Sequence, residues 1–127
     1  MYSERLLDHF QNPRNVGELP PPAVTVEASN PICGDILRLS VEFRDGRVAE
    51  ARYLTRGCTA SIAAGSALTE WLTGKAEPEI AALRPADIEK LVGGLSAESK
   101  HAAVLAVDAA RAALAKASQP IRRQVRA

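Results

Sequence analysis

The sequence predicts a single α+β domain, in which a small three-stranded antiparallel sheet packs against several helices and the last helix is long. At 127 residues, the chain is long enough for one hydrophobic core and too short for two. Its first half contains runs in which apolar and polar residues alternate, as strands require, whereas its second half has helical spacing. Strands followed by helices are typical of α+β domains. We expect the domain to span residues 1–117, followed by a basic, disordered tail at 118–127.

A short helix is expected at the N-terminus. Ser3 is a favourable N-cap, and Leu6, Leu7 and Phe10 follow it at helical spacing. The next segment contains Asn-Pro, Gly17 and three consecutive prolines, so we expect an extended connection there.

Three strands are expected at residues 23–29, 35–43 and 47–55. The second strand shows the clearest alternation, with four apolar residues on one face, from Leu37 to Phe43. An Asp-Gly pair at 45–46 separates the second and third strands, and such a pair favours a tight hairpin because glycine readily adopts a positive φ. Antiparallel pairing is therefore predicted.

Helices are expected over the remainder of the chain. One should begin at Cys58 and stop before Gly74, and two short helices should have Pro78 and Pro85 in their first turns. The last helix should start near Ser96 and consists mainly of strong helix formers. Within it, Asp108 and Arg111 are spaced to form an ion pair.

Composition excludes several classes of partner. Sixteen basic and fifteen acidic residues leave a net charge of +1, which gives no electrostatic footprint for nucleic acid or an anionic membrane. The N-terminus lacks the continuous apolar stretch of a signal peptide, and no segment approaches membrane-spanning length. Two cysteines without a secretory signal favour a reducing compartment, so we expect the protein in the cytoplasm.

Four residues could supply metal ligands. Cys33 and Asp35 lie in the loop before the second strand, Cys58 lies at a helix start, and His101 lies in the first turn of the last helix. Two thiols, a carboxylate and an imidazole form a donor set that suits tetrahedral zinc or iron. Spacing alone is also compatible with two inert buried thiols and a surface histidine. His9 is expected to be structural, because it stands alone on a short amphipathic helix.

The chain resembles the IscU/NifU-type iron–sulfur cluster assembly scaffolds. Four stretches carry the resemblance: "YSERLLDHFQNPRNVG" at the start, "ICGD" around the first cysteine, "RGCTASIAAGSALTEWLTGK" around the second, and "KHAAVLAVDAARAAL" in the last helix. They cover nearly the whole chain apart from the tail, and they occur in the family's order.

The resemblance implies a non-enzymatic scaffold or carrier that binds iron or a two-iron cluster and passes it to recipient apo iron–sulfur proteins. By position, Cys33, Cys58 and His101 match cluster-binding residues, and Asp35 matches an aspartate that tunes cluster lability. A cysteine desulfurase is the implied sulfur donor.

The sequence departs from the family pattern at two places. The family has a third cysteine directly after the histidine, where this chain has Ala102, and a methyl group can neither bind iron nor carry a persulfide. The family's Leu-Pro-Pro-Val-Lys chaperone segment is replaced by "LSAES". We therefore have less reason than in other family members to expect sulfur delivery by a desulfurase. The same holds for chaperone-driven release.

Three alternatives remain open from the sequence. A homodimer could share one cluster between two copies of the site. A degenerate relative could instead close Cys33, Asp35, Cys58 and His101 around one structural zinc ion. A thiol enzyme with a Cys58 nucleophile and a His101 base is the least supported, since the sequence indicates no oxyanion hole.

Overall fold

The computed structural model describes residues 2–32 and 34–118 and confirms the expected α+β class. The chain forms, in order, α1 (Glu4–Gln11), β1 (Val24–Ser29), β2 (Ile36–Arg44), β3 (Arg47–Arg56), α2 (Thr59–Leu72), α3 (Glu77–Ala81), α4 (Pro85–Leu91), a 3₁₀ turn η1 (Ala97–Ser99) and α5 (Lys100–Ala117). The expected tail beyond residue 118 lies outside the described residues.

The sheet is an antiparallel meander in the order β1-β2-β3. Asp45 and Gly46 both have positive φ, 57° and 78°, as the expected tight hairpin requires. Arg44 and Arg47 therefore pair directly at the turn, and the register continues to Ile36 opposite Arg56. The start of β2 and the end of β3 consequently lie side by side.

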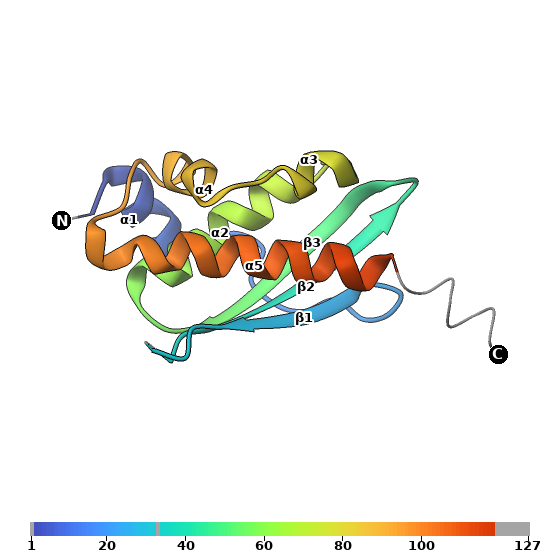
Figure 1. Ribbon diagram of the computed structural model, residues 1–127, viewed down its shortest axis with the longest axis horizontal. Helices are drawn as coiled ribbons and strands as arrows, with labels where there is room; N and C mark the ends of the chain where they lie inside the picture. The colour runs from blue at the N-terminus through green and yellow to red at the C-terminus, as the bar shows by residue number, and fades with distance from the viewer. Residues whose placement is uncertain (1, 33, 119–127) are drawn as a thin grey trace.

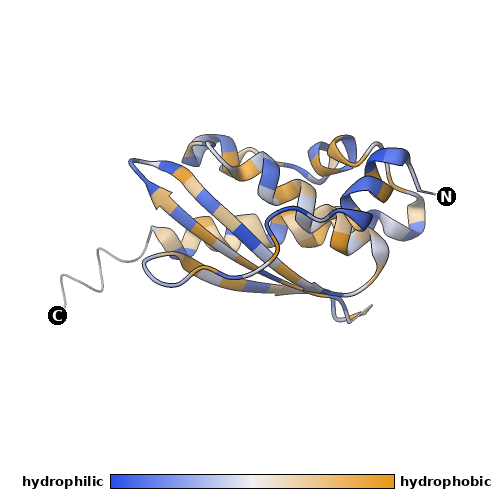
Figure 2. Ribbon diagram, turned by 180° about the vertical axis from the view of Figure 1, so that it is seen from behind, coloured by the Kyte–Doolittle hydropathy of each residue, from blue (hydrophilic) through white to orange (hydrophobic). Residues whose placement is uncertain are grey.

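Helices α2 and α5 lie on one face of the sheet, and the shorter helices pack on these two (Figure 1). Close packing is possible because the buried face of α2 consists largely of small residues, including Ala60, Ala63, Ala64 and Ala67. A Cβ on Gly65 would lie only 2.5 Å from Tyr53 Cδ2, so α2 approaches β3 as closely as the backbone allows. Seen from behind, hydrophilic and hydrophobic residues alternate along the strands of the sheet (Figure 2).

The N-terminal helix differs from expectation in the face that it buries. Ser3 caps α1 as predicted, accepting a hydrogen bond from the Leu6 backbone N–H. Only Leu6 of the three apolar residues is fully buried, while Leu7 and Phe10 are each 37% exposed. The second buried residue is His9, because a hydrogen bond to Ser66 on α2 satisfies its ring.

One expected ion pair is absent from the described residues. Arg111 does not pair with Asp108 but donates a hydrogen bond to the Leu83 carbonyl oxygen at 3.2 Å. Asp108 is exposed. None of the helices in the described part of the chain is both long and apolar enough to cross a bilayer.

Candidate metal and cluster site

Three segment ends meet at one end of the molecule, on the left in Figure 1. Asp35 directly precedes β2, Cys58 is the N-cap of α2, and His101 is the second residue of α5. The β2–β3 register brings Asp35 beside the β3–α2 connection, and the packing of α5 on β1, β2 and α2 brings in His101. The structure thus gathers three of the four ligand candidates.

The three donor atoms lie close to one another. Asp35 Oδ2 is 3.5 Å from Cys58 Sγ and 3.2 Å from His101 Nε2, and the Cys58 sulfur is 3.7 Å from the same ring nitrogen. Cys58 and His101 are partly exposed, whereas Asp35 is only 5% exposed. The site is therefore a shallow cluster of donors that solvent can reach through the sulfur and the imidazole.

These distances fit a tetrahedral metal ion. Zinc bonds of about 2.0–2.3 Å to nitrogen, oxygen and sulfur place the ligand atoms about 3.3–3.6 Å apart along the edges of a tetrahedron. The three measured separations, 3.2, 3.5 and 3.7 Å, span that range. One sulfur, one nitrogen and one oxygen also suit zinc or iron chemically.

Asp35 is held as a carboxylate. Burial raises the pKa of Asp35, but hydrogen bonds from Ser61, Cys58 and His101 outweigh burial, so that the net pKa lies below its ordinary value of 3.8. All three of these contacts reach the same oxygen, Oδ2. Asp35 therefore presents a negative oxygen to the space between the thiol and the imidazole.

The orientation of the His101 ring is set from outside the cluster. Its Nδ1 lies 3.0 Å from the Glu98 carbonyl oxygen, which can only accept a hydrogen bond, so Nδ1 carries a proton. Because Nδ1 keeps its proton, Nε2 is the nitrogen whose proton a metal ion can replace, and Nε2 faces Asp35 and Cys58. A backbone carbonyl that fixes the tautomer in this way is typical of metal-binding histidines.

Two further residues shape the cluster, and sequence reasoning missed both. Ser61 is fully buried and donates its hydroxyl proton to Asp35 Oδ2 at 2.6 Å; its Oγ also lies 3.4 Å from Cys58 Sγ. A Cβ on Gly57 would lie 2.6 Å from Asp35 Cγ. Ser61 could have been found from its position three residues after Cys58, on the same helix face.

Three other positions named from the sequence have separate outcomes. Cys33 lies outside the described residues, so its ligand role stays a prediction. Ala102, at the place of the family's third cysteine, has no exposed surface. His9 lies in the α1–α2 interface, where Ser66 Oγ is 2.8 Å from Nδ1, as its expected structural role requires.

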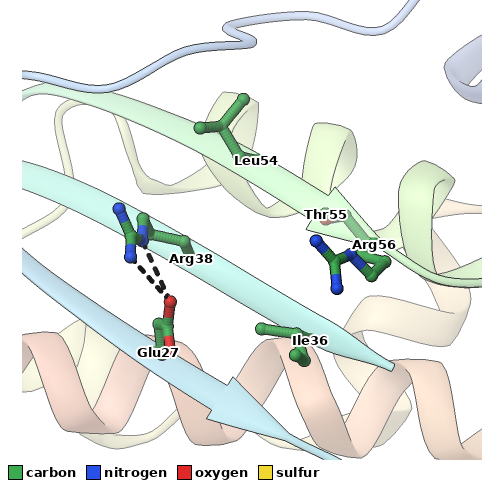
Figure 3. Close-up of a pocket in the computed structure, with 6 residues that line it drawn as sticks. All are labelled: Glu27, Ile36, Arg38, Leu54, Thr55 and Arg56. Carbon is green, nitrogen blue, oxygen red and sulfur yellow. Dashed lines mark hydrogen bonds and ion pairs between the residues drawn. The ribbon is translucent and has the colours of Figure 1, made fainter. Parts of the chain in front are cut away.

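A groove of about 360 Å³ lies on the sheet face that Figure 3 shows. Ile36 and Leu54 give it apolar walls, and Arg38 at its side is held by Glu27 at 2.8 Å (Figure 3). None of its lining residues belongs to the donor cluster. The groove contains no second group of metal ligands among the described residues.

Comparison with known proteins identifies the family. The model of the NifU-like N terminal domain matches residues 1–123. The iron–sulfur cluster assembly scaffold protein IscU 1 of Archaeoglobus fulgidus is 37% identical over 114 residues, covering 90% of this chain and 74% of that protein. The IscU scaffold protein of Escherichia coli K12 is 38% identical over 118 residues, covering 90% of this chain and 91% of that protein.

A solved structure shows the same fold. The crystal structure of a nitrogen-fixing NifU-like protein (N-terminal) from Brucella abortus superposes with a TM-score of 0.76 at 17% identity, over 93% of this chain and 94% of the other. This likeness supports the architecture, while the family assignment rests on the sequence matches. The chain belongs to the NifU-like N-terminal domain family.

Proposed function

We propose that this protein is an iron–sulfur cluster assembly scaffold or carrier, which binds iron or a cluster and passes it to recipient proteins. The observation that carries the proposal is the convergence of Asp35, Cys58 and His101, whose donor atoms all lie within 4.8 Å of one another. The scaffold names of relatives at 37% and 38% identity support it. The cluster is cargo in this role, and the protein has no need of a catalytic group.

Each residue has a distinct task in the proposed site. Cys58 and Cys33 supply thiolates, the ligands that iron–sulfur clusters prefer. His101 binds through Nε2 while the Glu98 carbonyl holds its other nitrogen. Asp35 supplies a hard oxygen beside the soft sulfur; such an oxygen exchanges more readily than a thiolate, and a carrier must release what it binds.

The buried Ala102 limits how a cluster could be built here. Without a thiol at that position, the described part of the site offers one sulfur, and Cys33 would bring the total to two. A cluster with two irons takes four terminal ligands, so Cys33, Cys58 and His101 need one more, from Asp35, from a second copy of this chain or from a recipient's thiolate. We therefore favour a carrier role in the cytoplasm, with a weaker dependence on a cysteine desulfurase.

Anaerobic purification and reconstitution test the proposal. Iron and acid-labile sulfide should copurify or reconstitute with broad visible absorption, and Cys58→Ser, Cys33→Ser and His101→Ala should each reduce that absorption. The loaded protein should also activate an apo iron–sulfur recipient. Absence of sulfide in every preparation would reject the scaffold role.

The donor geometry also fits a closed structural zinc site, because its three edges match tetrahedral zinc. Stoichiometric zinc without sulfide, together with a large loss of thermal stability on chelation, would identify that function instead. Family membership favours the scaffold role.

A further inference from the structure

Three potential hydrogen-bond donors converge on one oxygen, and they respond differently when a metal ion binds. Asp35 Oδ2 lies 3.5 Å from the Cys58 thiol, 3.2 Å from His101 Nε2 and 2.6 Å from the Ser61 hydroxyl. A bound metal takes the Cys58 sulfur as a thiolate and the Nε2 lone pair, so neither can still donate to Asp35. Ser61 does not have to lose its proton and keeps its contact.

From this difference we propose that Ser61 is a positioning residue of the metal site, which holds the Asp35 carboxylate in its binding orientation when the other two partners have turned to the metal. The inference rests on the proposed metal-binding function. Ser61 is not placed as a ligand; it acts through Asp35.

The surroundings of Asp35 support this assignment. On one side, the carboxylate packs against Gly57, where a Cβ would lie 2.6 Å from Asp35 Cγ and 2.8 Å from Oδ1. On the other side stands the Ser61 hydroxyl, which is fully buried in the first turns of α2. Packing against Gly57 restrains the carboxylate, and the Ser61 hydrogen bond is the contact that can keep Oδ2 facing Cys58 and His101 once a metal has bound.

The position of Ser61 on α2 explains how one helix serves two ligands. Ser61 lies three residues after Cys58, and residues at this spacing share a helix face. Its Oγ lies 3.4 Å from Cys58 Sγ and 2.6 Å from Asp35 Oδ2. The start of α2 therefore supplies a sulfur ligand and also the group that orients an oxygen ligand from another segment.

A double-mutant cycle tests whether Ser61 acts through Asp35. Co²⁺ is the probe, and its affinity is measured anaerobically by competition with a chromophoric chelator for the wild type, Ser61→Ala, Asp35→Ala and the double variant. Loss of a group that orients a metal ligand typically weakens affinity about 10–100-fold, so we expect at least a tenfold loss for Ser61→Ala. In the Asp35→Ala background the same substitution should change affinity by less than about twofold.

Ser66→Ala is the matched control. Ser66 is also fully buried on α2, but its hydroxyl contacts His9 and the Arg14 backbone N–H, which lie outside the metal site. We expect Ser66→Ala to lower thermal stability and leave Co²⁺ affinity unchanged. Circular dichroism of the metal-free variants confirms that each is folded.

The outcomes separate this inference from the proposed function. Equal losses from Ser61→Ala in both backgrounds, or no loss in either, would overturn the role of Ser61. A wild type that binds no Co²⁺ would overturn it as well. A wild type that binds Co²⁺ with the expected coupling but never carries sulfide would leave Ser61 in its role and reject only the cluster scaffold.

Discussion

Gly57 and Asp35 are in contact across the site: a Cβ on Gly57 would lie 2.6 Å from Asp35 Cγ. Contacts this short are not tolerated, so any side chain at residue 57 must displace the carboxylate. The glycine between β3 and the N-cap of α2 therefore makes room for an oxygen ligand that comes from another segment.

Gly57→Ala should weaken metal binding. The new methyl pushes Asp35 away from Cys58 and His101, and we expect about a tenfold or greater loss of Co²⁺ affinity and a stability loss of about 1–3 kcal/mol, measured by competition titration and urea unfolding. Gly65→Ala is the control, because its Cβ would lie 2.5 Å from Tyr53 Cδ2, away from the donors. The Gly65→Ala variant should lose stability and retain metal affinity. If Gly57→Ala bound Co²⁺ as tightly as the wild type, the packing argument would be contradicted.

Asp35→Ala should weaken the binding of a single metal ion and slow the release of a cluster. A single metal ion loses one of three described ligands and binds more weakly. A cluster held by the remaining slowly exchanging ligands should pass to an apo recipient several-fold more slowly, as stopped-flow absorption would show. Asp108→Ala, at an exposed carboxylate outside the donor cluster, should leave transfer unchanged. Transfer at or above the wild-type rate in Asp35→Ala would refute the labilising role.

His9 should make stability depend on pH. Burial lowers the pKa of His9 from its ordinary 6.5 and the nearby Arg14 lowers it further, which outweighs the opposing effects of Glu70 and Asp8. Between that lowered pKa and 6.5, the unfolded chain binds more protons than the folded one. The unfolding free energy is therefore undiminished above pH 6.5 and falls as pH drops through the folded pKa, with a slope of up to about 1.4 kcal/mol per pH unit.

Urea unfolding of the metal-free protein between pH 7.5 and 5 measures this slope. His9→Asn retains a side-chain acceptor for the Ser66 hydroxyl but does not titrate in this range. The variant should lose most of the slope, and an undiminished slope would assign the pH dependence to other groups.

Ala102→Cys should restore part of the missing sulfur chemistry. The position directly follows His101 and is fully buried, and cysteine is small enough to replace a buried alanine at modest cost. With a cysteine desulfurase as the sulfur source, we expect cluster yield to rise, measured as sulfide per chain. Ala103→Cys places the same group at the next buried position and should give no gain. Equal yields from the two variants would mean that the missing third thiol does not limit assembly.

Local sequence determined the secondary structure, because each element depends on nearby residues. Ser3 caps α1, Asp45 and Gly46 form the hairpin turn, and Pro78 and Pro85 lie in the first turns of α3 and α4, all as predicted. The motifs around Cys33, Cys58 and His101 also sufficed to indicate the family, since they carry its residue types in order.

Only the tertiary structure decided which side chains meet. It buried His9 in place of Leu7 and Phe10, since Ser66 on α2 offers a partner to the ring. It turned Arg111 to the Leu83 carbonyl and away from Asp108. It also brought Ser61 and Gly57 against Asp35, across 26 and 22 positions of the chain. Helical spacing fixes the direction of a side chain relative to its own helix, whereas its partners depend on the register of β2 with β3 and on the packing of α2 and α5, which no local pattern specifies.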